Sequence, residues 1–121
     1  IADSGSSRIL RVNVSDAKST GRLQAFPGDG ILEGYKGAKV EVLVAPGKEL
    51  KTPSGLGFYK DTIYVADYAT SKIHAYDTKG KLLRSLDTGL PPNSLGGLTV
   101  SPEGRIYFVD MKTPAIVRID P

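Results

Sequence analysis

The feature that most limits the fold of this chain is an internal repeat with an offset of 42 or 43 residues. Residues 53–77 read PSGLGFYKDTIYVADYATSKIHAYD, and residues 95–120 read LGGLTVSPEGRIYFVDMKTPAIVRID. The matching pairs are Gly55 and Gly97, Leu56 and Leu98, Ile63 and Ile106, Tyr64 and Tyr107, Asp67 and Asp110, Ile73 and Ile116, and Asp77 and Asp120. A period of this length indicates one structural unit that is stacked on its neighbours.

A third copy opens the chain with the phrase IADSGSSRILRVN. Asp3, Ile9 and Val12 have the spacing of Asp67, Ile73 and Tyr76. The offset between these two copies is 64 residues, so the link between them carries about 21 extra residues, as expected of an insertion in a repeat protein.

Each copy contains short runs of β-branched and aromatic residues between Gly, Pro, Asp and Lys-Gly turns, which is typical of successive antiparallel strands. Helical periodicity is absent. The expected strands cover residues 55–60, 62–67, 72–77, 81–87, 96–101, 105–110 and 115–120. Four short strands in every 43 residues predict an all-β fold built from β-propeller blades.

Composition excludes several classes of protein. The 121 residues fit a single domain, and 40% apolar content is enough for a core. The net charge is +3 and the Lys and Arg residues are dispersed rather than clustered in a run, so a nucleic-acid partner is not expected. There is no cysteine, which excludes disulfides, thiolate catalysis and cysteine metal sites. No apolar window reaches the length of a membrane span, so we expect a soluble chain.

Several phrases resemble the NHL-type blade of six-bladed propellers: Pro53-x-Gly55-Leu56, then residues 63–67 (IYVAD), residues 72–77 (KIHAYD) and residues 80–83 (GKLL), with the opening IADSG followed by Arg8-Ile9. The resemblance implies a β-propeller segment of nearly three four-stranded antiparallel blades. It divides one partial domain, 1–121, into part of a first blade (1–26), an insertion with an extra strand (27–50), a second blade (51–90) and part of a third (91–121).

Fewer than three blades cannot close a six-bladed ring, so we expect this chain to be a piece of a longer propeller. The alternative is that two or more copies assemble into a ring. The absence of an initiator Met and of a signal sequence agrees with truncation or processing.

The repeated aspartates Asp3, Asp67 and Asp110 are candidates for metal or acid–base chemistry, but a residue that recurs in every copy favours a structural task. We expect their carboxylates to accept hydrogen bonds from backbone N–H groups at the turn that follows. Arg8 and Lys72, five positions after two of these aspartates, are expected to cover the turns rather than to bind a substrate.

Three other features have simpler interpretations. Residues 87–89, Asp-Thr-Gly, match the short signature of aspartic proteases, but only one copy is present and a turn explains it. His74 is the sole histidine, which rules out a site of several histidines within one chain, and a packing or surface role is expected. Asn13 begins a glycosylation sequon, in a strand position that Asp77 and Asp120 occupy in the other copies.

The regucalcin- and gluconolactonase-like propellers are similar in blade sequence, and that more distant resemblance implies a calcium-dependent lactonase. In those proteins an Asn-Gly at the start of an innermost strand supplies an oxygen ligand for Ca²⁺. Here the corresponding pairs are Ser54-Gly55 and Gly96-Gly97, and Asn93 lies three positions too early.

The insertion carries the candidate ligand-binding residues, Tyr35 and Lys36. The Gly-rich segment 27–37 is expected to form a loop at a ring face, and residues 40–44 to form an extra or outermost strand. No Gly-Lys-Ser/Thr follows these glycines, so a phosphate loop is not expected.

The sequence thus favours a non-catalytic NHL-like binding or scaffold module, secreted or periplasmic, with no catalytic residues, metal or cofactor. Its expected partners are a protein or small molecule at the propeller face, together with remaining blades from the same or another chain. The alternative function, part of a calcium-dependent lactone or ester hydrolase, stays open, because missing blades can carry the ligands.

Overall fold

Tight turns with left-handed residues set the order of the strands. In the computed structural model, which describes residues 1–23 and 32–120, Lys60 and Asp61 both have positive φ, 43° and 58°. Two such residues in succession form the hairpin turn that matches the twist of antiparallel strands. Gly80, at φ 83°, and Gly104, at φ 87°, stand at two other expected turns.

The described residues form twelve strands and one short 3₁₀ helix, η1, in an all-β chain. Their bounds are β1 Ala2–Asp3, η1 Ser4–Ser6, β2 Arg8–Asn13, β3 Lys18–Leu23, β4 Leu32–Lys36, β5 Lys39–Val44, β6 Pro53–Tyr59, β7 Thr62–Asp67, β8 Lys72–Asp77, β9 Leu82–Asp87, β10 Leu95–Val100, β11 Ile106–Asp110 and β12 Ala115–Ile119. The seven strands expected after residue 50 are confirmed to within two residues at each end. No helix in the described residues is long and apolar enough to cross a membrane.

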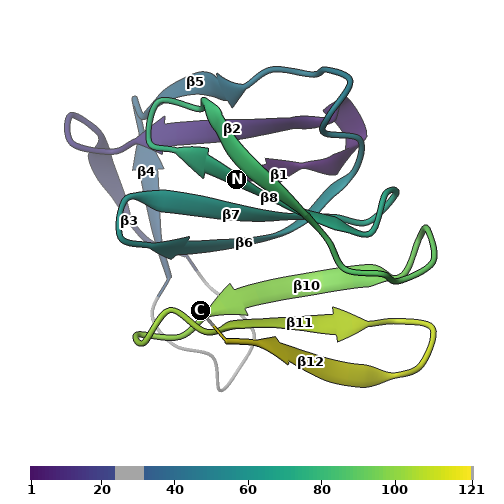
Figure 1. Ribbon diagram of the computed structural model, residues 1–121. Coiled ribbons are helices and arrows are strands. Elements are labelled where there is room, and N and C mark those ends of the chain that lie inside the picture. The colour runs from purple at the N-terminus through teal and green to yellow at the C-terminus, as the bar shows by residue number, and fades with distance from the viewer. Residues whose placement is uncertain (24–31, 121) are drawn as a thin grey trace. The chain divides into compact units, whose positions relative to one another are not determined.

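The strands form four small sheets, with the orders β1-β2-β5, β3-β4, β6-β7-β8-β9 and β10-β11-β12. The consecutive pairs within β6–β9 and within β10–β12 are all antiparallel. Figure 1 shows β10, β11 and β12 side by side, next to the layer that contains β6 and β7. We call β1-β2-β5 the first sheet, β6–β9 the second sheet and β10–β12 the third sheet.

Strand β5 occupies the outermost place in the first sheet, as β9 does in the second. The connection between β8 and β9 is residues 78–81, whereas the connection between β2 and β5 is residues 14–38. The 21 extra residues of the repeat are therefore inserted between two strands of one sheet. The predicted outermost strand at 40–44 is confirmed as β5, and it belongs to the first sheet.

Part of the expected Gly-rich loop is instead a strand. Residues 32–36 form β4, which pairs with β3 in antiparallel register, with Tyr35 opposite Ser19 and Lys36 opposite Lys18. The register shifts at a bulge between Ser19 and Gly21. Gly21 interrupts the strand pattern in the sequence, so the pairing was not expected. Residues 27–31 of the expected loop lie outside the described residues.

The chain divides into two compact units, and each has its own internal structure. One unit, residues 11–41, contains the β3–β4 hairpin, and within it Arg11 Nε donates to Glu41 Oε1 at 2.5 Å. The other unit comprises residues 1–10 and 42–121, and all buried residues named below belong to it.

The second sheet is buried on both faces by alternation along its strands. One face carries Val65 and Tyr76, which pack in a cluster with Ile9, Val44 and Leu50. The opposite face carries Ala66 of β7 and Ile73 of β8. They pack in a cluster with the third sheet, composed of Ala66, Ile73, Leu95, Leu98, Ile106 and Phe108.

Glycine at position 55 lets the backbones of β6 and β10 approach closely. A Cβ at Gly55 would lie 2.5 Å from the backbone nitrogen of Leu98. Its repeat counterpart, Gly97, has open space at the same place. The two glycines occupy equivalent strand positions, but only Gly55 is needed for packing between sheets.

We expect Gly55→Ala to lower the free energy of unfolding by about 1–3 kcal/mol, because the clash falls on backbone that cannot rotate away. Gly97→Ala is the matched control and should change it by less than about 0.5 kcal/mol. Urea unfolding followed by circular dichroism measures both values. Equal losses in the two variants would contradict this account of the contact between the sheets.

Candidate functional site

The three repeated aspartates accept hydrogen bonds from the turns that follow them, as predicted. Asp3 Oδ1 accepts from Ser6 N at 3.2 Å, and Asp110 Oδ1 accepts from Lys112 N at 2.9 Å. Asp110 Oδ2 also accepts from the Thr113 hydroxyl, and this bond and the Lys112 N–H lower the pKa of Asp110. These carboxylates are occupied by local structure.

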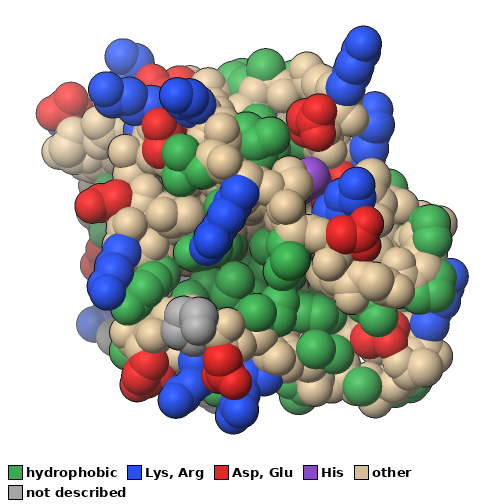
Figure 2. Space-filling view, viewed as in Figure 1, with side chains coloured by type: hydrophobic (Ala, Val, Ile, Leu, Met, Phe, Trp, Pro, Cys, Tyr) green, Lys and Arg blue, Asp and Glu red, His purple; other side chains and the backbone are tan. Residues whose placement is uncertain are grey.

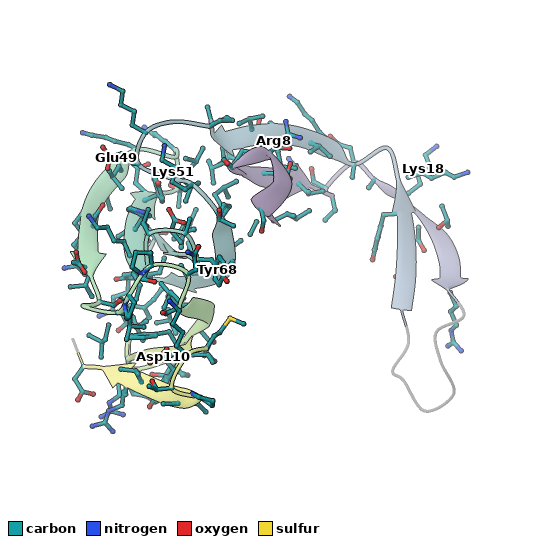
Figure 3. All side chains as sticks on the ribbon, turned by 90° about the vertical axis from the view of Figure 1, so that its right-hand side faces the viewer. Arg8, Lys18, Glu49, Lys51, Tyr68 and Asp110 are labelled. Carbon is teal, nitrogen blue, oxygen red and sulfur yellow. The ribbon has the colours of Figure 1, made fainter. Side chains whose placement is uncertain are left out.

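Asp67 has the most buried of these carboxylates and holds two segments together. Its Oδ1 accepts from Thr52 N at 2.9 Å and Ala69 N at 3.1 Å, and its Oδ2 accepts from Lys51 N at 2.9 Å. A buried carboxyl group requires several such donors, because burial without hydrogen bonds is costly. Figure 3 shows Glu49 and Lys51 close together in the segment that leads into β6.

The two basic residues that follow the aspartates behave differently. Arg8 Nε donates to Asp3 Oδ2 at 2.7 Å, and this bond lowers the pKa of Asp3. The Nζ of Lys72 instead lies 4.0 Å from Asp87 Oδ2, across the β8–β9 pair. Arg8 therefore forms a direct ion pair with the aspartate of its own copy, whereas Lys72 lies near an aspartate of the neighbouring strand.

His74 lies in the core beside Asp67, with 1% of its side chain exposed. Its Nδ1 is hydrogen-bonded to Ser85 Oγ at 2.8 Å, and its Nε2 lies 3.7 Å from Asp67 Oδ2. The packing role predicted for His74 is confirmed, on the face opposite Ile73.

Burial lowers the pKa of His74, because the charged imidazolium is poorly solvated there, while Asp67 and Glu49 raise it and Lys72 lowers it further. Burial also raises the pKa of Tyr76 to about 12. The rings of His74 and Tyr76 are in tilted contact, and their centroids lie 6.3 Å apart. Both side chains are therefore neutral near pH 7 and contribute to packing.

Tyr35 and Lys36 are adjacent on β4 of the hairpin. Tyr35 is 51% exposed, and its hydroxyl donates to Glu33 Oε2 at 3.0 Å, which raises the pKa of Tyr35. Lys36 is directly opposite Lys18, whose side chain extends from the hairpin in Figure 3. Like charges in directly opposite positions repel each other, so this end of the hairpin favours an anionic neighbour.

The other sequence motifs are explained by turns and backbone contacts. Asp87 Oδ1 accepts from Gly89 N at 3.0 Å, so the Asp-Thr-Gly motif is a turn. Ser54 Oγ donates to Gly96 O at 2.8 Å and connects the second and third sheets. Asn13 Oδ1 accepts from Ser15 N at 2.9 Å, as Asp77 Oδ1 accepts from Lys79 N at the same distance.

Two serines that the sequence did not single out connect successive sheets. Ser7 Oγ donates to Lys51 O at 2.5 Å, and its repeat counterpart Ser71 donates through Oγ to Pro91 O at 2.6 Å. Both residues have left-handed backbone, at φ 52° and 53°. Ser7 and Ser71 occupy equivalent positions of the repeat, and this was the one sequence signal for their shared role. The third copy has Pro114 at this position.

One cavity lies between the second and third sheets. Its volume is about 420 Å³, and its lining includes Tyr64, Leu86, Ile106, Ile119 and Arg84. Figure 2 shows hydrophobic side chains in a hollow on this face of the molecule. Within residues 1–23 and 32–120 there is no group of three or more His, Asp or Glu side chains that could hold a metal ion.

No family model matches the chain, and no curated protein matches it. Among solved structures, the chain is similar to the one described as "Crystal structure of the computationally designed Ika4 protein", with 18% identity and a TM-score of 0.47. The match covers 74% of this chain and 58% of that one, so the chain spans less than two thirds of its length. The class that the structure defines is an all-β protein of repeated, small antiparallel sheets.

We expect the stability of the chain to fall as the pH drops below about 6.5, the ordinary pKa of histidine. The unfolded chain takes up a proton at His74 in this range before the folded chain does, so acid favours unfolding. The pKa values of Asp3, Asp77 and Asp110 are lowered below 3.8, so their contributions are lost only at lower pH.

Urea unfolding between about pH 7.5 and about pH 5.5 measures this loss. His74→Gln, which retains a polar group for Ser85, should abolish most of the pH dependence in that range. The same slope in both proteins would show that another group is responsible.

Proposed function

We propose that this chain is part of an NHL-like β-propeller that serves as a non-catalytic binding or scaffold module. The observation that carries the proposal is that residues in equivalent positions of the repeat face the same way in three successive sheets. Propellers and other stacked repeats are built by this regularity. The remaining blades would come from the same or another chain.

Ile9, Ile73 and Ile116 are the clearest series. Ile9 is buried in a cluster with Val65 and Tyr76 of the second sheet. Ile73 is buried in a cluster with the third sheet, including Phe108. Ile116 is 78% exposed, as expected for the face on which a further sheet would pack in a propeller.

The use of the carboxylates supports a non-catalytic role. Asp67 accepts three backbone N–H bonds and Asp110 accepts bonds from Lys112 and Thr113, so each carboxylate has a structural task that it would have to give up in catalysis. Catalytic acids and bases generally sit where a substrate can reach them.

The hairpin β3–β4 is the binding surface that we propose. It interrupts the regular repeat between two strands of one sheet, and functional segments of repeat scaffolds are commonly insertions of this kind. Exposed Tyr35 offers an aromatic surface, and Lys36 beside Lys18 offers positive charge. The ligand that suits this surface is a protein or small molecule with an apolar group next to an anionic group.

We expect Tyr35→Ala to weaken the binding of peptides selected on the purified chain by at least about tenfold, because an exposed aromatic anchor usually dominates a small interface. Random peptides displayed on phage are the probe, and fluorescence anisotropy gives the affinity of those selected. Lys36→Ala should weaken the binding of acidic peptides more than that of the other selected peptides. Phe58→Ala is the control, since Phe58 is an exposed aromatic residue, 61% accessible, on β6.

Binding that is equal in all variants would contradict the role of the hairpin. Hydrolysis of a lactone by the chain, dependent on added Ca²⁺, would contradict the non-catalytic role and favour the lactonase alternative. The two results are independent and identify which part of the proposal fails.

A further inference from the structure

The β3–β4 hairpin is a sheet of two strands, and both of its outer edges are open among the described residues. It lies inside the chain, between β2 and β5 in sequence, and belongs to the compact unit of residues 11–41. The repeat has no strand to place beside it, because the equivalent connection in the second sheet is only residues 78–81. A hairpin of two strands is marginally stable alone in water, so an added strand would stabilise it.

The two edges of the hairpin differ in how well they suit another strand. Strand β3 carries one extra residue at the bulge between Ser19 and Gly21, and Gly21 has a positive φ of 91°. A bulge bends a strand and disrupts regular pairing along its edge. The extra residue is on β3, so β4 keeps its backbone N–H and C=O groups in regular alternation. The outer edge of β4 is therefore the better acceptor.

The charges at one end of the hairpin favour an acidic ligand residue. Lys18 and Lys36 are both exposed and lie directly opposite each other. Among the described residues, no carboxylate forms an ion pair with either lysine. Arg22, by contrast, lies opposite Glu33, so the charges at that level are of opposite sign. An acidic residue opposite Lys36 on an added strand would balance the two lysines.

The middle of the hairpin has a cross-strand pair without side chains. Gly34 lies opposite Gly21, and a Cβ on Gly21 would meet no described heavy atom within 4 Å. Glycine within a strand leaves room for a ligand that approaches the backbone closely. The Tyr35 hydroxyl donates to Glu33 Oε2 at 3.0 Å, so these two side chains share the other side of β4. An aromatic side chain opposite Gly34 would cover bare backbone.

A second copy of β4 does not match these charges. When two identical strands pair symmetrically and antiparallel, residues that lie opposite one another are an even number of positions apart. Glu33 is the acidic residue of β4, and it is three positions from Lys36. Glu33 of one copy therefore cannot lie opposite Lys36 of the other. A peptide segment of different sequence is free of this restriction.

We propose that the outer edge of β4 is a strand-acceptor site for an extended peptide segment of a partner protein. The segment runs antiparallel to β4, with an acidic residue opposite Lys36, a β-branched residue opposite Tyr35 and an aromatic residue opposite Gly34. Recognition is by strand addition, in which backbone hydrogen bonds supply affinity and alternate side chains supply specificity. This site rests on the proposed function of the hairpin, for which it names the ligand and the mode of binding.

A blocked peptide with the sequence Thr-Glu-Val-Phe-Thr-Ser tests the site. In antiparallel register its glutamate lies opposite Lys36, its valine opposite Tyr35 and its phenylalanine opposite Gly34. We expect saturable binding to the 121-residue chain with a Kd of about 1 mM or tighter. Hydrogen exchange at the amides of β4 should become slower when the peptide is bound, because an added strand pairs with them.

Two methylated probes distinguish strand addition from binding through side chains alone. One carries N-methyl groups at its glutamate and phenylalanine, and the other carries them at its valine and the following threonine. Because alternate amides of an added strand face its neighbour, one probe should lose its binding and the other should keep most of it. Equal affinities of the two probes would overturn the backbone pairing.

Charge reversal identifies the register of the added strand. Lys36→Glu should weaken the binding of the probe by at least about tenfold, and a probe with lysine in place of its glutamate should recover most of that loss. The variant places a carboxylate opposite Lys18, so the hairpin is expected to fold. Lys48→Glu changes the net charge equally at another exposed position and is the matched control.

The site is overturned if the folded chain does not bind the probe at about 1 mM, or if Lys36→Glu and Lys48→Glu weaken binding equally. It is also overturned if light scattering shows a dimer that excess probe does not dissociate, since a second copy would then occupy the edge.

The strand-acceptor site and the proposed function can fail separately. A chain that binds the phage-selected peptides through Tyr35 but does not bind this probe overturns the strand-acceptor site and leaves the proposed function standing. Selected peptides that bind the Tyr35→Ala variant as tightly as the unchanged chain contradict the proposed function itself.

Discussion

The close approach of two backbones, β6 of the second sheet and β10 of the third, is the constraint on which the larger compact unit depends. Gly55 leaves the room for it, and Ser54 uses the nearness to donate a hydrogen bond to the Gly96 carbonyl. Because β-sheets usually pack through their side chains at about 10 Å, this contact of main chains brings β6 and β10 closer together than side chains would allow. The cavity of about 420 Å³ near Leu86 lies where side chains rather than backbones separate the sheets.

A second constraint is polar and lies inside the second sheet. The carboxylate of Asp67 satisfies three backbone N–H groups from two segments, and the neutral imidazole of His74 fills the space beside it. A buried carboxylate of this kind is stabilising only while all of its partners are present. Asp67 is therefore the reason that the turn after β7 and the segment before β6 keep one geometry.

The sequence was sufficient for the strands and turns of the regular repeat, since Ile, Tyr and Val alternate there between Gly- and Asp-containing turns. It was insufficient for β3 and β4, because Gly21 and Gly34 weaken the strand pattern, and pairing between distant segments decides the structure. The local role of the aspartates followed from their recurrence. The connection between sheets through Ser7 and Ser71 did not, because a hydroxyl that reaches a distant carbonyl leaves no trace in local spacing.

The insertion of the hairpin along the chain between β2 and β5, two strands of the first sheet, has a consequence for how such a chain can change. Strands β2 and β5 remain in one sheet although residues 14–38 separate them, where residues 78–81 suffice between β8 and β9. The entropy of loop closure grows only with the logarithm of length, so the longer connection costs about 1.6 kcal/mol more. The turn before an outermost strand is thus a place where a new segment can be acquired, varied or exchanged while the stacked sheets behind it stay the same.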